Sequence, residues 1–469
     1  MHYSKLNDFP DHFLWGASSS AYQAEGAWNE DGKSPSIIDM YEHPKEYADF
    51  KTASDHYHRY KEDIQLFAEM GLKAYRFSIA WTRIIPDGTG EINPAGIAHY
   101  RDVIQECRRY HIEPIVTMYH FDLPYCLEEK GGWSSRETID AFEAYAKVLF
   151  THFGNDVTYW LTINEQNTMI LHPGAIGLPK GGTLPSKKEL YQQNHHLMLA
   201  QAKAMKLCHK LCPRGKIGPA LNLTAMYPET CNPSDSIAAH NWEVLRCWNF
   251  ADVPVFGWYH PLAWNYLVHR ELEPEIAPGD REILMGADPD FIAMNYYSTA
   301  TIAASRGDST DVSARAGDQQ IMLGEEGVYR AAENPFVSKT KYGWVIDPEG
   351  FRYTLRKVYE RYRLPILITE NGIGAPDRLE NGQIHDDYRI EFIRRHLHAM
   401  RLAITDGVEM LGYCPWAALD VVSTHQGYQK RYGFIYVDRD EFDLKEMKRI
   451  KKDSFFWYQK IIEENGNSL

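Results

Sequence analysis

The chain has 469 residues, of which 44% are hydrophobic and 24% are charged, with 12 Trp, 30 Tyr and 19 Phe. This is the composition of an ordinary globular protein, so extensive disorder is excluded. The 50 Lys and Arg against 64 Asp and Glu give a net charge of −14, which argues against nucleic-acid binding and against a general attraction to anionic membranes or substrates.

The N-terminal segment and the cysteines lead to an expectation about location. Residues 1–16 contain no charged stretch followed by an apolar one, so no secretory signal is expected. No run of 18 apolar residues occurs, so no membrane-spanning helix is expected. The seven cysteines are odd in number and form no C-x-x-C pair, which fits reduced thiols better than a disulfide framework. The sequence therefore predicts a cytoplasmic protein.

Short apolar runs alternate with helical patterns along the chain. Helical periodicity covers residues 55–70, 137–153, 190–212 and 386–406. The apolar runs are those typical of buried parallel strands, at residues 13–18, 74–79, 115–120, 158–164, 216–222, 291–297, 365–370 and 410–416. Eight strands alternating with helices predict an α/β fold, the (β/α)8 TIM barrel, with an open doubly wound sheet as the alternative.

The alternating pattern continues without a linker, so we expect residues 1–469 to form a single barrel domain. A minimal barrel needs about 250 residues, and the excess length predicts long loops after the strands. The most polar stretch, residues 305–326, is interpreted as one such surface loop.

Polar or aromatic residues stand near the carboxyl ends of the strands: Arg76 within the second strand, and, at or just beyond the ends of the strands, Gln23, His120, Asn164, Glu165, Asn222, Asn295, Tyr297, Glu370 and Trp416. The carboxyl ends of barrel strands meet at one rim, where active sites lie. Glu165 and Glu370 therefore face the same rim despite their distance in sequence. Two carboxyl groups about 5–5.5 Å apart are what the hydrolysis of a glycosidic bond with retention requires.

Several sequence motifs occur in order along the chain. They are FLWGASSSAYQAEGA (13–27), YRFSIAW (75–81), HFDLP (120–124), TINE (162–165), NYY (295–297), GWVIDPEG (343–350), ITENG (368–372), and WAALD (416–420) followed by GYQKRYGFIYVD (427–438). Together they resemble the retaining β-glycosidases of glycoside hydrolase family 1. The resemblance spans nearly the whole chain and implies that family's barrel fold and double-displacement mechanism.

The resemblance also implies roles for individual residues. Glu370 matches the nucleophile and Glu165 the general acid/base. Arg76 and Tyr297 match groups that hydrogen-bond the nucleophile, and Asn164 matches the residue that binds the sugar 2-hydroxyl. The remaining sugar-binding positions are Gln23, His120, Asn295 and Trp416.

The C-terminal motif departs from that of the plain β-glucosidases in the family. They carry a glutamate for the sugar 4- and 6-hydroxyls where Ser423 stands here, and a glutamate would repel a 6-phosphate. Lys430 and Tyr432 follow, and this S-x6-K-x-Y spacing is similar to that of the family's 6-phospho-β-glycosidases, which bind phosphate with these three residues. One fixed positive charge and two neutral donors suit a dianion. The alternative is that Lys430 and Arg431 form a solvated loop pair and that Tyr432 is a packing aromatic.

The expected substrates are 6-phospho-β-D-glucosides, such as phosphorylated cellobiose, salicin or arbutin. The family's 6-phospho-β-galactosidases usually carry a tryptophan where Thr424 stands. Dual gluco- and galactosidase activity stays open, as does transglycosylation. The alternatives are a β-glucosidase or β-galactosidase for unphosphorylated sugars and, less favoured because both carboxylates are present, an inactive carbohydrate-binding relative.

No cofactor or metal is expected, and the expected partner is a small phosphorylated β-glucoside, with neither nucleic acid nor membrane. Self-association into a homo-oligomer is left open. We expect the aglycone to be bound by variable loops at residues 174–185 and 305–342.

Overall fold

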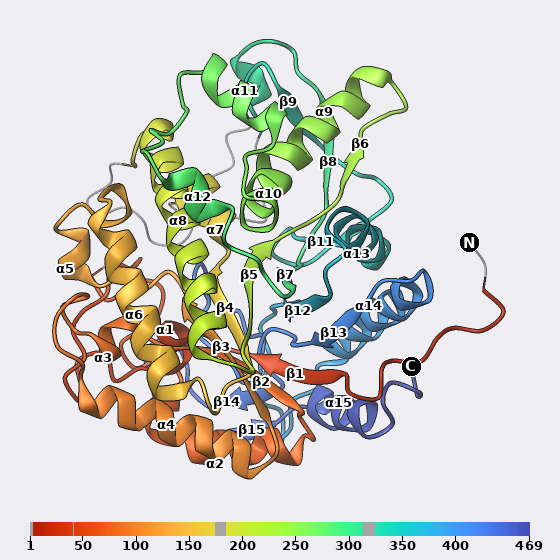
Figure 1. Ribbon diagram of the computed structural model, residues 1–469. Coiled ribbons are helices and arrows are strands. Elements are labelled where there is room, and N and C mark those ends of the chain that lie inside the picture. The colour runs from red at the N-terminus through yellow and green to blue at the C-terminus, as the bar shows by residue number, and fades with distance from the viewer. Residues whose placement is uncertain (1–2, 41, 174–183, 313–323) are drawn as a thin grey trace.

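A closed barrel of eight parallel strands forms the centre of the computed structural model, which describes residues 3–40, 42–173, 184–312 and 324–469 (Figure 1). The strands are, in barrel order, β1 (Leu14–Ser18), β2 (Ala74–Ser78), β3 (Glu113–Tyr119), β4 (Tyr159–Asn164), β5 (Lys216–Asn222), β7 (Ile292–Asn295), β12 (Ile366–Glu370) and β13 (Met410–Tyr413). Each strand pairs with the next, and β13 closes on β1 through Leu14–Gly412 and Trp15–Tyr413. All eight lie at the predicted positions, so the TIM barrel is confirmed and the open sheet is wrong.

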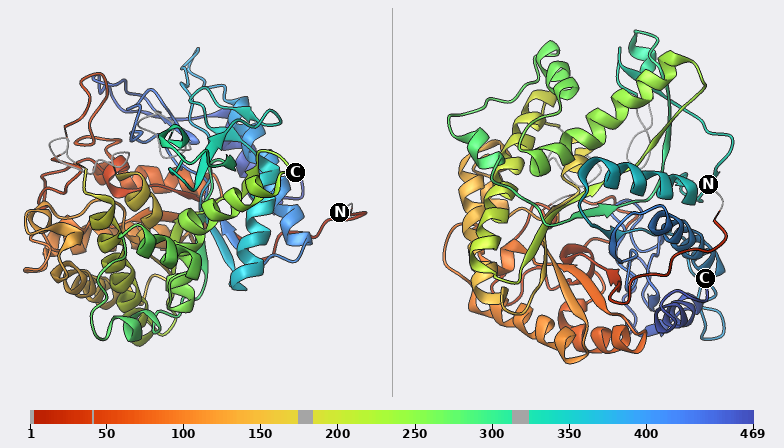
Figure 2. Two further views of the ribbon diagram at one scale, coloured as in Figure 1. Left: turned by 90° about the horizontal axis from the view of Figure 1, so that it is seen from above. Right: turned by 45° about the vertical axis from the view of Figure 1, so that its right-hand side comes forward.

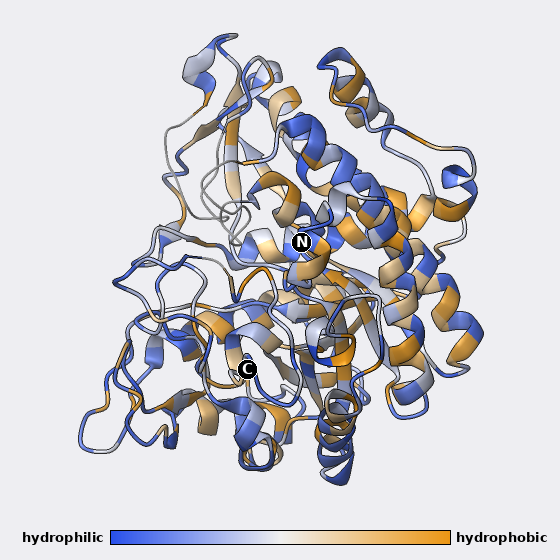
Figure 3. Ribbon diagram, turned by 90° about the vertical axis from the view of Figure 1, so that its left-hand side faces the viewer, coloured by the Kyte–Doolittle hydropathy of each residue, from blue (hydrophilic) through white to orange (hydrophobic). Residues whose placement is uncertain are grey.

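Helices surround the barrel, as the views in Figures 1 and 2 show. The four predicted helices are confirmed as α2 (His56–Glu69), α6 (Glu137–Phe153), α8 (Lys187–Leu211) and α14 (Asp387–Thr405). Many helices carry polar residues on one face and apolar residues on the other (Figure 3), the pattern of a helix that packs on a core. None of the helices in the described ranges combines the length and hydrophobicity that a bilayer crossing needs.

The other elements lie between these units or in the loops. The remaining helices are α1 (Ala21–Ala24), α3 (Trp81–Ile84), α4 (Pro94–Arg109), α5 (Tyr125–Glu128), α7 (Gln166–Leu171), α9 (Pro233–Glu243), α10 (Asn249–Phe256), α11 (Pro261–His269), α12 (Asp280–Leu284), α13 (Pro348–Tyr362) and α15 (Asp453–Glu463). The remaining strands are β6 (Met226–Pro228), β8 (Ala300–Ala304), β9 (Tyr329–Ala332), β10 (Ser338–Lys339), β11 (Val345–Ile346), β14 (Ile435–Val437) and β15 (Arg449–Lys451). Of the predicted surface loop at 305–326, residues 313–323 lie outside the described residues.

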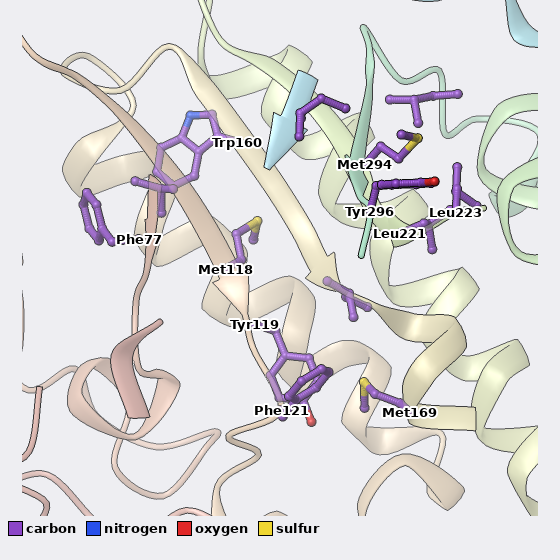
Figure 4. Close-up of a cluster of buried hydrophobic side chains, with 14 of the residues drawn as sticks. Phe77, Met118, Tyr119, Phe121, Trp160, Met169, Leu221, Leu223, Met294 and Tyr296 are labelled. Atoms are coloured by element: carbon purple, nitrogen blue, oxygen red, sulfur yellow. The ribbon is translucent and has the colours of Figure 1, made fainter. Parts of the chain in front are cut away.

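Side chains that alternate along the strands separate into two apolar clusters. The larger includes Phe77, Met118, Trp160, Leu221 and Met294 and lies between the strands and the surrounding helices (Figure 4). The smaller consists of residues on the opposite strand faces, among them Ala74, Ile115, Leu161, Ala220, Ala293 and Leu367. Ala74 is two residues before Arg76 on the same face of β2, so this small cluster forms the floor beneath the polar residues at the rim.

A buried ionic network fastens the C-terminal segment to the barrel. Lys452 is fully buried, and its Nζ contacts Asp420 Oδ1 at 2.7 Å and Asp377 Oδ2 at 2.5 Å. Arg431 binds the second oxygen of Asp420 at 2.9 Å, and Arg389 binds Asp377 at 3.1 Å. Each buried charge therefore has an opposite charge beside it, which buried ionic groups require.

This network predicts different effects for two neighbouring lysines. Lys452→Met should lower the free energy of unfolding by about 3–5 kcal/mol, because it leaves two buried carboxylates without their shared cation. Lys451→Met is the matched control, since Lys451 pairs with Glu69 at the surface, and should cost less than about 1 kcal/mol. Urea unfolding followed by tryptophan fluorescence would measure both, and equal shifts would contradict the prediction.

Candidate active site

One cavity at the carboxyl ends of the barrel strands gathers most of the predicted site residues. It encloses about 460 Å³, counting the part that opens to solvent. The predicted residues that line it are Gln23, His120, Asn164, Glu165, Tyr297, Glu370, Trp416, Ser423 and Tyr432. The other three, Arg76, Asn295 and Lys430, contact these lining residues from behind.

Glu370 ends β12 and is held by a cation and a hydroxyl. Arg76 donates from Nη1 to Oε1 at 2.7 Å, and Tyr297 donates its hydroxyl hydrogen to Oε2 at 2.7 Å. Burial and the negative charge of Glu370 hold the pKa of Tyr297 well above its ordinary value, so this hydroxyl stays protonated as a donor. Both carboxyl oxygens of Glu370 are therefore held in place by a donor.

Arg76 is fully buried and joins three strands. Its Nε donates to Thr117 Oγ1 of β3 at 2.7 Å, and its Nη2 donates to Asn164 Oδ1 of β4 at 2.6 Å. Together with the hydrogen bond to Glu370 of β12, these contacts fix the position and orientation of the planar guanidinium. The geometry of the guanidinium therefore sets the relative positions of Glu370 and Asn164.

Glu165 lies where β4 turns into α7, with a left-handed backbone (φ 43°). Its Oε1 accepts hydrogen bonds from Asn222 Nδ2 at 3.1 Å and from Asn295 Nδ2 at 2.9 Å, and its Oε2 accepts one from Thr168 Oγ1 at 2.8 Å. Burial, and then the negative charge of Glu370, raise the pKa of Glu165 to about 7. The two carboxyl groups of one cavity thus differ in their environment, and Glu165 is the one suited to keep a proton near neutral pH.

The remaining rim residues form a polar wall with aromatic rings. His120 Nε2 lies 3.1 Å from Asn164 Nδ2, and burial together with Arg76 holds the pKa of His120 well below its ordinary value. The neutral ring therefore accepts a hydrogen bond from the amide. The Trp416 ring stacks 6.2 Å from His120. Gln23 donates to the Val422 carbonyl oxygen at 2.8 Å, which ties the first βα loop to the segment that carries Ser423.

Ser423, Lys430 and Tyr432 are all buried at this end of the cavity, with exposures of 4%, 1% and 5%. The Lys430 Nζ lies 3.7 Å from the centroid of the Trp344 ring and 5.5 Å from that of Tyr432. The solvated loop pair considered from the sequence is therefore wrong, because Lys430 and Arg431 are both buried.

Gly374 makes room for this lysine. A Cβ atom at position 374 would lie 2.6 Å from Lys430 Cγ and 2.8 Å from Tyr432 Cε1, which is too close for any other residue. The glycine two residues after the ITENG segment therefore allows Lys430 to pack against Tyr432, which lines the cavity.

Several contributing residues were not singled out from the sequence. Thr117 and Thr168 bind Arg76 and Glu165, and Trp344 forms the wall beside Lys430. Thr117 could have been found, since it follows the inward alternation of β3, whereas Trp344 lies in a loop with no such pattern. Of the loops expected to bind an aglycone, residues 174–183 and 313–323 lie outside the described residues. Within the described ranges no group of three or more His, Cys, Asp or Glu is placed to hold a metal ion.

Comparisons with known proteins agree with this geometry. The sequence model of glycosyl hydrolase family 1 matches residues 5–467. The aryl-phospho-beta-D-glucosidase BglC of Bacillus subtilis is 44% identical, with 98% of each chain covered. A 6-phospho-beta-glucosidase of Dickeya chrysanthemi is 40% identical, with 99% of each chain covered. The solved structure of a family 1 β-glucosidase from Thermotoga maritima superposes with a TM-score of 0.87 at 33% identity, covering 98% of this chain and 99% of that one.

The environment of Glu165 predicts that its pKa depends on Glu370. Glu370→Gln removes the negative charge, so the pKa of Glu165 should fall from about 7 toward, but not to, its ordinary value, because the burial remains. Carbon-13 NMR of labelled glutamate side chains would follow this titration. Glu446→Gln, which removes a fully exposed carboxylate paired with Lys448, serves as the control and should leave the titration unchanged. An unshifted pKa in Glu370→Gln would contradict the prediction.

Proposed function

The chain belongs to glycosyl hydrolase family 1 and is a glycoside hydrolase, and from this we propose that it hydrolyses 6-phospho-β-D-glucosides with retention of configuration. The observation that carries the choice of substrate is the buried Lys430 ammonium against the rings of Trp344 and Tyr432, which line one cavity together with Ser423, Glu165 and Glu370. The relatives reported above, an aryl-phospho-beta-D-glucosidase and a 6-phospho-beta-glucosidase, support it.

In the proposed first step Glu370 attacks the anomeric carbon. Its carboxylate forms a covalent ester with the sugar while the glycosidic bond breaks, and Glu165 gives its proton to the departing oxygen. Arg76 and Tyr297 hold the two oxygens of Glu370 in position until it reacts. Asn164, fixed by Arg76, is positioned to bind the sugar 2-hydroxyl.

In the second step water attacks the glycosyl ester. Formation of the ester removes the negative charge of Glu370, so the Coulombic part of the raised pKa of Glu165 disappears. Glu165, now ionised, accepts a proton from the water as the sugar–Glu370 bond breaks and Glu370 recovers its charge. One carboxyl group thus acts first as acid and then as base. A sugar hydroxyl in place of water would give transglycosylation.

The sugar is oriented by the other groups of the cavity. Gln23, His120 and Asn295 supply polar contacts near the glycone, and the Trp416 ring suits its C–H face. Ser423 and Tyr432 offer neutral hydroxyl donors and Lys430 a positive charge to the 6-phosphate. Thr424, whose hydroxyl lies beside that of Tyr22, stands where the family's 6-phospho-β-galactosidases usually carry a tryptophan. The proposed substrates are therefore 6-phospho-β-glucosides, including aryl 6-phospho-β-glucosides and phosphorylated cellobiose.

The proposal extends to organisation and location. Residues 1–469 act as one catalytic barrel domain, and the substrate is a small molecule. A cytoplasmic location fits the seven cysteines, which are all free thiols at described positions. The net charge of −14 supports the absence of a nucleic-acid partner.

The two carboxylates give the first test. Glu370→Gln should abolish turnover of nitrophenyl 6-phospho-β-glucoside, because no nucleophile remains. Glu165→Ala should slow both steps, and azide should partly restore the rate as a small external nucleophile that needs no general base. Steady-state release of nitrophenol measures both variants, and the azide product would be a β-glycosyl azide. Unchanged turnover in Glu370→Gln would refute the mechanism.

Lys430 gives the test of substrate choice. Lys430→Ala should lower kcat/KM for nitrophenyl 6-phospho-β-glucoside by about 10–100-fold, the usual value of a hydrogen bond to a charged group. Hydrolysis of unphosphorylated nitrophenyl glucoside should be far less affected. Lys445→Ala, at the surface beside Asp438, is the control. If Lys430→Ala reduced both rates equally, the alternative of an enzyme for unphosphorylated sugars would be favoured.

A further inference from the structure

A second cavity lies next to the hydrogen-bond partners of Glu165. It has a volume of about 420 Å³, counting the part that opens to solvent, and shares no lining residue with the cavity that contains Glu370. Thr168 and Asn222 line it, and these are the residues that bind the two carboxyl oxygens of Glu165. In a retaining hydrolase the acid and the nucleophile act on opposite sides of the anomeric carbon, so the leaving group departs on the side of the acid.

Arg246 contributes the positive charge of this second cavity. It is 9% exposed and lies within a π-helical segment, Val244–Trp248, between α9 and α10. Such segments interrupt α-helices at a cost and are frequent at functional sites. The Arg246 carbonyl oxygen accepts a hydrogen bond from Asn167 Nδ2 at 3.1 Å, and Asn167 is two residues after Glu165. The helix that carries Arg246 is therefore fastened directly to the segment of the catalytic acid.

The described surroundings of the Arg246 side chain do not neutralise it. Among the residues that the structure describes, none that lines the second cavity is acidic, and Arg246 forms no ion pair. Its Nη2 contacts the Nε2 of His172, whose pKa is held well below its ordinary value by burial and by Arg246, so this histidine is a neutral acceptor. Glu325, which lies close enough to influence Tyr329, is itself bound by Lys187 and Tyr266.

A buried arginine without a carboxylate partner is uncommon, because the cost of removing its charge from water is normally offset by an opposite charge. The described lining of the second cavity thus carries a positive charge and no negative one, in a protein of net charge −14. Trp242, with its ring centroid 5.1 Å from the guanidinium carbon, and Leu171 add apolar surface that suits an aromatic ring.

We propose that the second cavity receives the leaving group and that Arg246 selects aromatic aglycones that carry a carboxylate. This inference rests on the proposed function, since it specifies the aglycone of the same substrates. In the first step the aglycone oxygen takes the proton of Glu165 as its bond to the sugar breaks, while the ring carboxylate stays paired with Arg246. Of the substrate, Arg246 contacts only the aglycone, which has left before water attacks the glycosyl ester. Arg246 therefore affects formation of the ester and not its hydrolysis.

The test compares two pairs of substrates that differ in one charge. They are 3- and 4-carboxyphenyl 6-phospho-β-glucosides and their methyl esters, and the readout is the ratio of kcat/KM for acid over ester. In the unmodified enzyme the ratio should be at least tenfold for one of the two positions. Arg246→Gln should lower that ratio by about 10–100-fold, the usual value of a charge-assisted hydrogen bond. Arg246→Lys should keep part of it, because the charge remains.

Folding yield cancels within each ratio, and the different reactivities of the two phenols cancel when the ratio of a variant is compared with that of the unmodified enzyme. Arg270→Gln, which removes an exposed arginine on the loop after α11, is the matched control and should leave the ratio unchanged. A ratio near one in the unmodified enzyme, or one that Arg246→Gln does not alter, would overturn the inference. If the methyl esters themselves were not hydrolysed, or were hydrolysed equally well without the 6-phosphate, the proposed function would fail instead.

Discussion

The Arg76 guanidinium is the group on which the rest of the rim depends. It is fully buried, and a buried cation is tolerated only when its hydrogen-bonding groups are used. Its three contacts to Thr117, Asn164 and Glu370 satisfy it and at the same time join β2, β3, β4 and β12 across the mouth of the barrel. Because the barrel interior has a low dielectric constant, burying the Arg76 charge costs free energy. The carboxylate of Glu370 at the end of β12 offsets that cost.

The difference between the two carboxyl groups follows from this arrangement. Glu370 has a cation and a phenol as partners, whereas Glu165 has two amides and a hydroxyl. Amide donors stabilise a carboxylate less than a guanidinium does, so burial dominates at Glu165 and its proton is retained to about pH 7. The same distribution of partners allows the charge of Glu370 to raise the pKa of Glu165, as the proposed role of Glu165 as first acid and then base requires.

The barrel strands and the residues at their ends could be predicted from the sequence because both depend on local pattern. Buried parallel strands are short apolar runs, and a charged or amide residue at the end of such a run stands out, as at Glu165 and Glu370. Trp344 and Arg246 could not be found in this way. Trp344 approaches Lys430 from a distant loop, and Arg246 lies in the π-helical segment Val244–Trp248, which no periodicity in the sequence predicts. The burial of Lys430 and Arg431 likewise depends on residues that are distant in sequence. Gly374 is one of them, because a side chain at this position would clash with Lys430.

The ionic network behind the cavity also shapes how this enzyme can change its substrate. Arg431 stands between Lys430 and Tyr432, and its side chain reaches Asp420 on the other side of the backbone. The segment is therefore two-sided: Lys430 and Tyr432, which are proposed to bind the phosphate, alternate with Arg431, which anchors the segment. Lys430 and Tyr432 can therefore be substituted without disturbing the ion pair between Arg431 and Asp420, provided that the number of residues between Asp420 and Arg431 is preserved. Specificity in this region can diversify by substitution, whereas an insertion or deletion would exchange the two sides and lose both.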